Sequence, residues 1–195
     1  MKSDGSCDTS IVEWCILNVD ADLFVIKSTI PVGTTDKLIQ KYGKHIIFSP
    51  EFTSTNVNGG VQDFVVLGGE RKLCNEIAQM YKKIKPASFE IVYTTPSTAE
   101  MSKYMMNCFL AAKVTFCNEI AKACAASGVE YDDVRNIFIK DSRINPSHTN
   151  VLTEQPYYDS HCFNKDIPAF VAQFHLPLMS AVDSINKTNI SKMKE

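Results

Sequence analysis

The sequence has no large excess of charge of one sign and no long hydrophobic run. Its 20 Lys and Arg residues face 22 Asp and Glu residues, a formal net charge of -2. Nucleic-acid-binding domains carry a basic excess, so we expect no nucleic-acid partner. The longest uncharged run, residues 167–182, is interrupted by two prolines, a glutamine and a histidine, and residues 1–6 lack an apolar signal core. We therefore expect no membrane span and no secretion.

Paired metal-binding or redox motifs are also missing. The seven cysteines are an odd number and include no C-x-x-C pair, which is typical of reduced thiols in a cytoplasmic protein. The four histidines show no ligand spacing, so no metal site is expected. With 45% hydrophobic and 22% charged residues, the 195-residue chain is instead typical of a folded globular protein with a real core.

Residues 1–96 are predicted to form an α/β domain. Short apolar runs at the positions given below alternate with helix-like segments, and this alternation favours a mostly parallel sheet covered by helices. A polar segment containing Asn58-Gly59-Gly60 separates the second expected strand from the third. The expected strands are 23–28, 45–49, 64–67 and 89–93, and the expected helices are 11–18, 34–42 and 71–85.

Residues 97–195 are predicted to be entirely helical. Ser97-Thr98-Ala99-Glu100 is typical of a capping box, and apolar residues then recur at helical spacing as far as Ala126, before Gly128. The pattern indicates one long helix. Shorter helices are expected at 132–139, 167–174 and 178–192.

A glycine-rich dinucleotide turn is absent. A complete NAD-binding domain places G-x-G-x-x-G after its first strand, so that backbone amides approach the pyrophosphate. Gly59-Gly60 and Gly68-Gly69 have the wrong spacing. With only about four candidate strands, the α/β half is similar to the latter part of a doubly wound, Rossmann-like fold.

Five separated motifs occur in order over nearly the whole chain. They are Asp4-Gly5-Ser6-Cys7-Asp8-Thr9-Ser10, residues 26–35 (Ile-Lys-Ser-Thr-Ile-Pro-Val-Gly-Thr-Thr), Ser49-Pro50-Glu51-Phe52, Ala99-Glu100-Met101-Ser102-Lys103 with Asn107, and Cys162-Phe163-Asn164-Lys165-Asp166. Their residues and order resemble those of the UDP-glucose/GDP-mannose dehydrogenase family. These enzymes oxidise a sugar primary alcohol to a carboxylate with NAD, so the resemblance implies NAD as cofactor and a nucleotide sugar, such as UDP-glucose, as substrate.

Cys162 matches the family's nucleophile, which forms a thiohemiacetal and then a thioester with the sugar. A thiolate is intrinsically nucleophilic near neutral pH, and Lys165 or a helix beginning near Asp166 would favour it. From composition alone, Cys162 would be interpreted as one of seven small core residues. The Cys-Phe-Asn-Lys-Asp context favours the nucleophile.

Lys103 and Asn107 lie four residues apart on one face of the expected long helix, with Glu100 about one turn earlier. The matching family residues contact the reacting oxygens, where a cation and an amide donor stabilise an oxyanion. A solvated helix face would contain the same residue types. The resemblance favours a site role for Lys103 and Asn107 and a structural role for Glu100.

Three further residues match groups that handle water in the family. Thr29 and Asp166 correspond to the pair that holds an ordered water, and Glu51 to the carboxylate assigned to thioester hydrolysis. Each also has a simpler interpretation: a hydroxyl at a strand end, a helix N-cap and a loop acid.

The resemblance assigns four more residues to ligands. Ser28 and Lys165 are expected at the cofactor, and Phe52 and Arg143 at the substrate. A guanidinium suits diphosphate or hydroxyl recognition, although Arg143 is equally interpretable as an ordinary surface arginine.

Two positions depart from the family pattern. Thr55 replaces a second acid after Pro-Glu-Phe, which removes a contact near substrate and cofactor. Tyr157-Tyr158-Asp159-Ser160-His161 replaces a glycine-rich stretch before the nucleophile, so the sugar pocket is expected to be reshaped or closed. His161 is not expected to pair with Cys162, because adjacent side chains usually diverge.

Two functions follow as hypotheses. In the first, the chain carries the sugar-oxidising half of a dehydrogenase and is inactive until an N-terminal segment, encoded separately, supplies the glycine turn. In the second, it is a truncated homologue without catalysis that acts as a binding or assembly module. Helices 97–126 and 178–192 resemble family helices that pair subunits, so a homodimer is expected.

Overall fold

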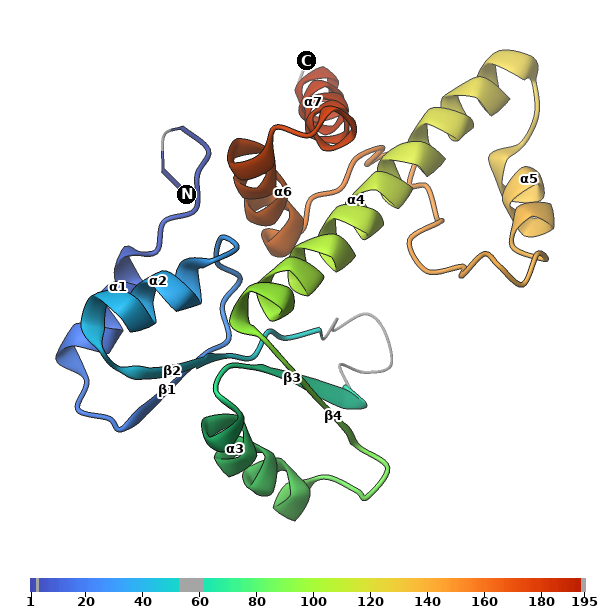
Figure 1. Cartoon of the computed structure of the whole chain (residues 1–195). Helices are drawn as coiled ribbons and strands as arrows, with labels where there is room; N and C mark the ends of the chain where they lie inside the picture. Colours follow the sequence, from blue (N-terminus) through green and yellow to red (C-terminus); the bar gives the residue numbers. More distant parts are fainter. Residues whose placement is uncertain (3, 53–61, 194–195) are drawn as a thin grey trace. The chain divides into compact units, whose positions relative to one another are not determined.

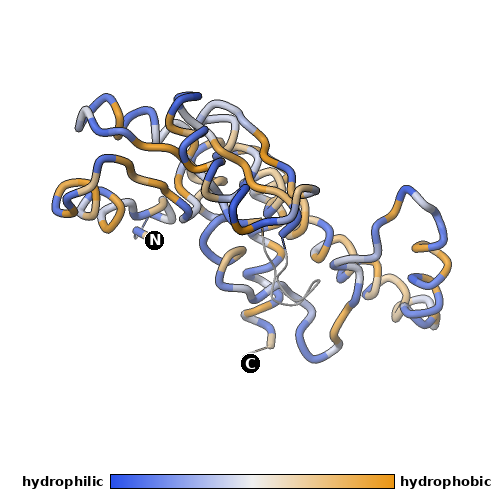
Figure 2. The backbone as a smooth tube through the Cα atoms, turned by 90° about the horizontal axis from the view of Figure 1, so that it is seen from below, coloured by the Kyte–Doolittle hydropathy of each residue, from blue (hydrophilic) through white to orange (hydrophobic). Residues whose placement is uncertain are grey.

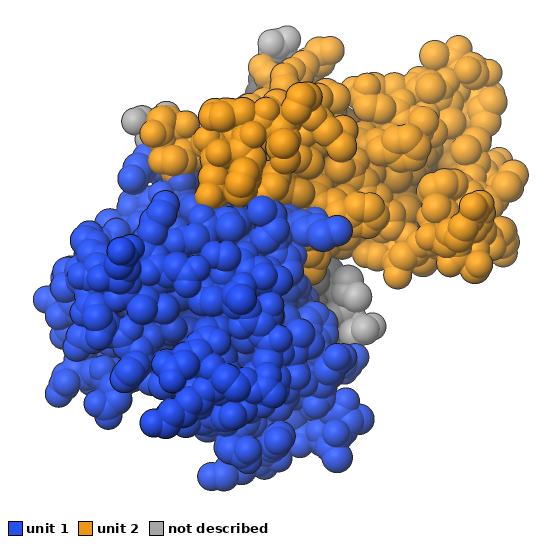
Figure 3. Space-filling model, in the orientation of Figure 1, with its two compact units in different colours: residues 1–3, 7–105 blue, residues 4–6, 106–195 orange. Residues whose placement is uncertain are grey.

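The computed structural model describes residues 1–2, 4–52 and 62–193. It divides into two compact units (Figure 3): residues 1–3 with 7–105, and residues 4–6 with 106–195. Hydrophobic and hydrophilic residues are interspersed along the chain (Figure 2). In the described ranges, no helix has both the length and the hydropathy needed to cross a membrane.

The first unit is built on a four-stranded sheet of order β1-β2-β3-β4. The strands are β1 (Leu23–Ile26), β2 (His45–Phe48), β3 (Phe64–Gly68) and β4 (Glu90–Thr94). β1 pairs with β2, and β3 with β4, in parallel.

The pairing of β2 with β3 is antiparallel, through Phe48 and Gly68, so the sheet is mixed, and the prediction of a mostly parallel sheet is confirmed for the other two pairings. A parallel connection needs a crossover, usually a helix. Residues 49–63 have no helical spacing of apolar residues, and an antiparallel connection does not require one. Thr55 and Gly59-Gly60 lie outside the described residues.

Helices cover both faces of this sheet (Figure 1). Successive strand residues point to opposite faces. Ile46 and Phe48 therefore pack in a core with α1 (Ser10–Asn18) and α2 (Thr34–Tyr42), whereas Ile47 packs in a second core with α3 (Arg71–Ile84). Because both faces of the sheet are covered, residues pointing to either face are apolar, and the strands are short continuous apolar runs in the sequence.

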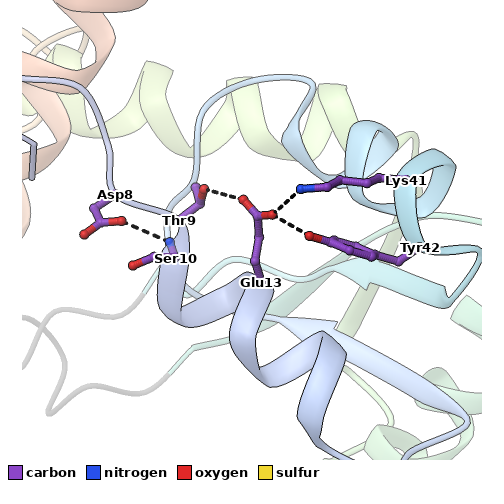
Figure 4. Close-up of polar contacts among 6 residues, drawn as sticks. All are labelled: Asp8, Thr9, Ser10, Glu13, Lys41 and Tyr42. Atoms are coloured by element: carbon purple, nitrogen blue, oxygen red, sulfur yellow. Dashed lines mark hydrogen bonds and ion pairs between the residues drawn. The ribbon is translucent and has the colours of Figure 1, made fainter.

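Polar contacts of Glu13 join α1 to α2 (Figure 4). Its carboxylate accepts hydrogen bonds from Lys41 Nζ at 2.8 Å, Tyr42 Oη at 2.6 Å and Thr9 Oγ1 at 3.3 Å. The bonds from Lys41 and Tyr42 lower the pKa of Glu13. Asp8 accepts a bond from the backbone N–H of Ser10 at 3.0 Å, which satisfies a donor at the start of α1.

The buried carboxylate of Glu100 holds the start of α2. It accepts hydrogen bonds from the backbone N–H of Gly33 at 2.5 Å, the N–H of Thr35 at 2.8 Å and Thr35 Oγ1 at 2.7 Å. Gly33 has φ +86°, a conformation that favours glycine. Burial raises the pKa of Glu100, and these hydrogen bonds oppose the change. Within the first unit Glu100 has the contacts of a structural residue.

The second unit is helical. α4 (Pro96–Ser127) begins in the first unit and continues into the second, and α5 (Tyr131–Phe138), α6 (His161–Phe174) and α7 (Pro177–Lys192) follow. α4 ends next to Gly128, whose φ is +66°.

α6 begins at His161, six residues before the start predicted from the sequence. Ser160 Oγ caps it by accepting the N–H of Phe163 at 3.0 Å. Pro168 resembles the first residue of a helix but lies within this one. Asp166 is therefore inside the helix, and its interpretation as an N-cap is wrong.

We predict that Glu100→Ala lowers the free energy of unfolding by about 3 kcal/mol, because three donors lose a charged acceptor. Glu119→Ala is the matched control, since Glu119 lies on the same helix but forms an exposed ion pair with Lys122. Its loss should cost less than about 0.5 kcal/mol. Urea unfolding measures both, and equal losses would contradict the structural role of Glu100.

Candidate active site

A buried hydrogen bond joins α4 to α6 in the second unit. Asn107 Nδ2 donates to Asp166 Oδ2 at 2.6 Å, and both residues are almost inaccessible to solvent. Lys165 Nζ contacts the other carboxylate oxygen, Oδ1, at 2.6 Å. Both oxygens of Asp166 are thus compensated, as a buried carboxylate requires. The structure brings together two residues that lie 59 positions apart in the sequence.

Cys162 lies in the first turn of α6 and is exposed. It precedes Asp166 by four residues, so the sulfur and the buried carboxylate share one side of the helix. The first turn of a helix has free backbone N–H groups, which favour negative charge nearby. Cys162 therefore combines access from solvent with proximity along α6 to the Asn107–Asp166 pair.

The other cysteine near Asp166 is not suited to chemistry. Cys108 is buried on α4, and burial, followed by the charge of Asp166, raises its pKa to about 12. At neutral pH it is a thiol, whereas the nucleophilic form is the thiolate.

Lys103 precedes Asn107 by one turn of α4 but belongs to the first unit. It is only 7% exposed, and its Nζ lies 5.6 Å from the centre of the Phe52 ring. The family resemblance assigned these two residues separately, to catalysis and to substrate. The structure places them in contact range of each other.

Residues at the carboxyl ends of β1 and β2 lie on one edge of the sheet, because these strands are parallel. Ser28, which is exposed, and Thr29 follow β1, and Glu51 follows β2. Glu51 pairs with Lys27 at 3.7 Å, where both side chains are largely exposed. Thr29 contributes its carbonyl oxygen to a 3.9 Å contact with the sulfur of Cys7.

Two residues of this edge were missed as candidates. Lys27 Nζ donates to the carbonyl oxygen of Ser49 at 3.3 Å as well as pairing with Glu51. Ser49 is fully buried, and in the described part of the chain its hydroxyl has no hydrogen-bond partner. Both belong to the motifs given above, where Lys27 adjoins Ser28 and Ser49 precedes Glu51 by two residues, and these positions were the signal in the sequence.

Arg143 is highly exposed and forms a short two-point pair with Asp141. This bond raises its pKa further. Its surroundings are those of a surface arginine, and its role at a substrate stays a prediction.

The tyrosines that replace the glycine-rich stretch fit without backbone strain. Among described non-glycine residues, only His148 and His175 have positive φ, so Tyr157–His161 take ordinary conformations. Tyr158 is buried edge-on against Phe163, with ring centres 5.7 Å apart, and Asn186 bonds its backbone N–H and C=O at 2.9 and 3.1 Å. In the described chain, no hydrogen bond joins His161 to Cys162.

The residues present do not form a complete dinucleotide site. The sequence has no G-x-G-x-x-G turn, Ser28 is an exposed residue beyond β1, and Lys165 Nζ is engaged by Asp166. Across the described ranges, no group of three or more His, Cys, Asp and Glu side chains is arranged to hold a metal ion.

Comparisons with known proteins match this architecture. Residues 97–188 match the model of the UDP-glucose/GDP-mannose dehydrogenase family, central domain. A UDP-glucose 6-dehydrogenase from Rhizobium meliloti is 33% identical over 89% of this chain and 44% of its own length. A UDP-N-acetyl-D-mannosamine dehydrogenase from Methanococcus maripaludis is 33% identical over 88% of this chain and 41% of its own.

Solved structures agree with these matches. A UDP-glucose dehydrogenase from Pyrobaculum islandicum superposes with a TM-score of 0.81 at 25% identity, over 96% of this chain and 48% of that one. The chain thus spans less than half the length of these relatives.

We predict that Cys162 reacts with iodoacetamide on the order of 100-fold faster than the buried thiols in the folded protein, because its side chain is exposed to solvent. Mass spectrometry of peptides sampled over time locates the label. Cys162→Ser should remove the fast phase, and Cys108 should react only after unfolding. Fast modification of Cys108 would contradict this geometry.

Proposed function

We propose that this chain, whose residues 97–188 match the central domain of the UDP-glucose/GDP-mannose dehydrogenase family, carries the covalent half of a nucleotide-sugar dehydrogenase active site. The observation that carries the proposal is Cys162, exposed one turn before a buried aspartate that is hydrogen-bonded to Asn107. By resemblance to the relatives, the substrate is UDP-glucose or a related nucleotide sugar.

Cys162 is the proposed nucleophile. Its thiolate adds to the carbonyl carbon of the sugar aldehyde, so that a C–S bond forms and the π electron pair moves to oxygen. The resulting oxyanion needs donors. Asn107 has two amide N–H groups and uses one on Asp166, which leaves the second for the oxyanion. Lys103, one turn earlier on α4, is proposed as the cationic donor.

Hydrolysis of the thioester requires a water and a base. A carboxylate accepts more than two hydrogen bonds, so Asp166 can hold a water in addition to its contacts with Asn107 and Lys165. Thr29 is proposed as the second group on that water. Glu51 is proposed as the base by the family resemblance, and its exposed carboxylate lies 3.7 Å from Lys27 Nζ.

NAD is the proposed cofactor: it would accept one hydride when the sugar alcohol becomes the aldehyde and a second when the Cys162 thiohemiacetal becomes the thioester. Because these residues contain no glycine-rich turn, we propose that its phosphates are bound by residues outside this sequence, on the same or a separate chain. Ser28 and Lys165 would then contact only part of the cofactor. Phe52 and Arg143 would contact the nucleotide sugar.

UDP-glucose should protect Cys162 from iodoacetamide, slowing its labelling at least fivefold at saturation. Bound substrate would cover the sulfur, whereas Cys15, on α1, should be labelled at an unchanged rate. Asn107→Ala should reduce the protection. Labelling of Cys162 that ignores millimolar UDP-glucose would contradict the assignment.

An assay of NADH formation separates the chemical step from the binding of UDP-glucose. Addition of a segment carrying G-x-G-x-x-G should give UDP-glucose-dependent NADH formation, and Cys162→Ser should abolish it while leaving binding of UDP-glucose intact. The isolated chain should give no NADH.

A second function, assembly, is favoured by an apolar stripe on α4. Met101, Met105, Phe109 and Phe116 follow helical spacing on one side of the helix and are 37%, 73%, 66% and 55% exposed. Large exposed apolar side chains in a row are typical of an interface. We propose a homodimer formed through this stripe.

Replacing Phe109 and Phe116 together with Glu should shift the protein from dimer to monomer in light scattering after size exclusion, because two charges would be buried unpaired. Met80→Glu, at a 61% exposed position on α3, is the matched control and should leave the mass unchanged. A wild-type monomer at micromolar concentration, or a dimer that survives the double substitution, would contradict the proposal.

A further inference from the structure

A cavity of about 510 Å³ lies in the first unit between the end of α3 and the edge strand β4. Its walls include Tyr81, Lys82 and Lys85 on the helix side and Phe89, Ile91 and Tyr93 on the strand side. The volume lies within the range of small-molecule sites. None of these residues belongs to the proposed active site, and Cys162 lies in the other unit.

Aromatic rings form much of this cavity. Tyr81 and Phe89 stack with their ring centres 5.6 Å apart and their planes inclined by only 14°. Tyr93 lies farther along β4, and the guanidinium of Arg71 stands over its ring at 3.5 Å. Tyr81, Phe89 and Tyr93 are all only partly buried, so they offer apolar and π surface to a planar ring.

The charge of the cavity is positive. Its lining contains Lys82 and Lys85 and no carboxylate. Glu90, the nearest acid along β4, points to the opposite face of the sheet, because residues alternate along a strand and Ile91 lines the cavity. The chain as a whole is slightly acidic, so this concentration of positive charge is local.

These cations are not used in ion pairs. Over the described ranges, neither Lys82 nor Lys85 nor Arg71 lies within ion-pair distance of an acid, whereas Lys27, Lys41, Lys122, Arg143, Lys165 and Lys187 each do. Lys85 instead lies 5.2 Å from the centre of the Phe89 ring. A ring-lined cavity with unneutralised cations at its wall is complementary to an aromatic molecule that carries an anionic group.

We propose that the α3–β4 cavity is a binding site for a planar aromatic anion of the nucleoside monophosphate class. The base packs against the rings of Tyr81, Phe89 and Tyr93, and the phosphate lies between Lys82 and Lys85. The site is independent of the proposed dehydrogenase chemistry.

Adenosine monophosphate is the probe, with adenosine and inorganic phosphate as its two halves, and calorimetry on the full chain measures Kd. The monophosphate should bind at least tenfold more tightly than either half. Lys82→Ala and Lys85→Ala should each weaken it about tenfold. Lys83→Ala is the matched control, because Lys83 adjoins Lys82 but does not line the cavity, and should change Kd less than twofold.

Three results would overturn the proposal: no binding at millimolar monophosphate, equal binding of adenosine and the monophosphate, or an equal effect of all three lysine substitutions. The last result would indicate a diffuse basic surface at the end of α3. Cys162→Ser should leave this Kd unchanged, so failure here is distinguishable from failure of the proposed dehydrogenase function.

Discussion

The hydrogen bond between Asn107 and Asp166 is the contact on which the proposed site depends. A carboxylate that leaves water must recover its solvation from donors, and here an amide on α4 and the neighbouring Lys165 supply them. The bond fixes this side of α6 against α4, and Cys162 lies on the same side, in the first turn of the helix. Cys162, one turn earlier, is exposed while Asp166 is buried. The same hydrogen bond therefore joins the two helices and orients two residues of the proposed site.

A second buried acid, Glu100, shows why residue type alone does not define a site. It lies on the same helix as Asn107, yet its oxygens accept bonds from the backbone of Gly33 and Thr35, which fix the start of α2. Burial raises the pKa of Glu100, and the hydrogen bonds from Thr35 and Gly33 act in the opposite direction. The two acids differ in their hydrogen-bond donors. The carboxylate of Glu100 accepts bonds from backbone N–H groups at the start of α2, whereas the carboxylate of Asp166 is bonded by the side chains of Asn107 and Lys165, one turn from the exposed thiol of Cys162.

Much of the fold was predictable because apolar periodicity and glycine positions are local signals. The antiparallel β2–β3 pairing is not local, and the early start of α6 was missed because Pro168 resembles a first helical residue while Ser160 is the cap. For the site, spacing alone put Lys103 and Asn107 on one face. The family resemblance assigned Asn107 and Asp166 to one active site but did not pair them with each other, and nothing in the sequence indicated that Tyr81 stacks on Phe89 across the end of α3.

The most direct test of the central claim is ¹³C NMR of the chain mixed with the 6-aldehyde of UDP-glucose labelled at C6. The account predicts a hemithioacetal signal that disappears in Cys162→Ser and weakens in Asn107→Ala. An aldehyde that stays free and hydrated in the presence of the wild-type chain, or a thiol adduct that survives Cys162→Ser, would contradict it.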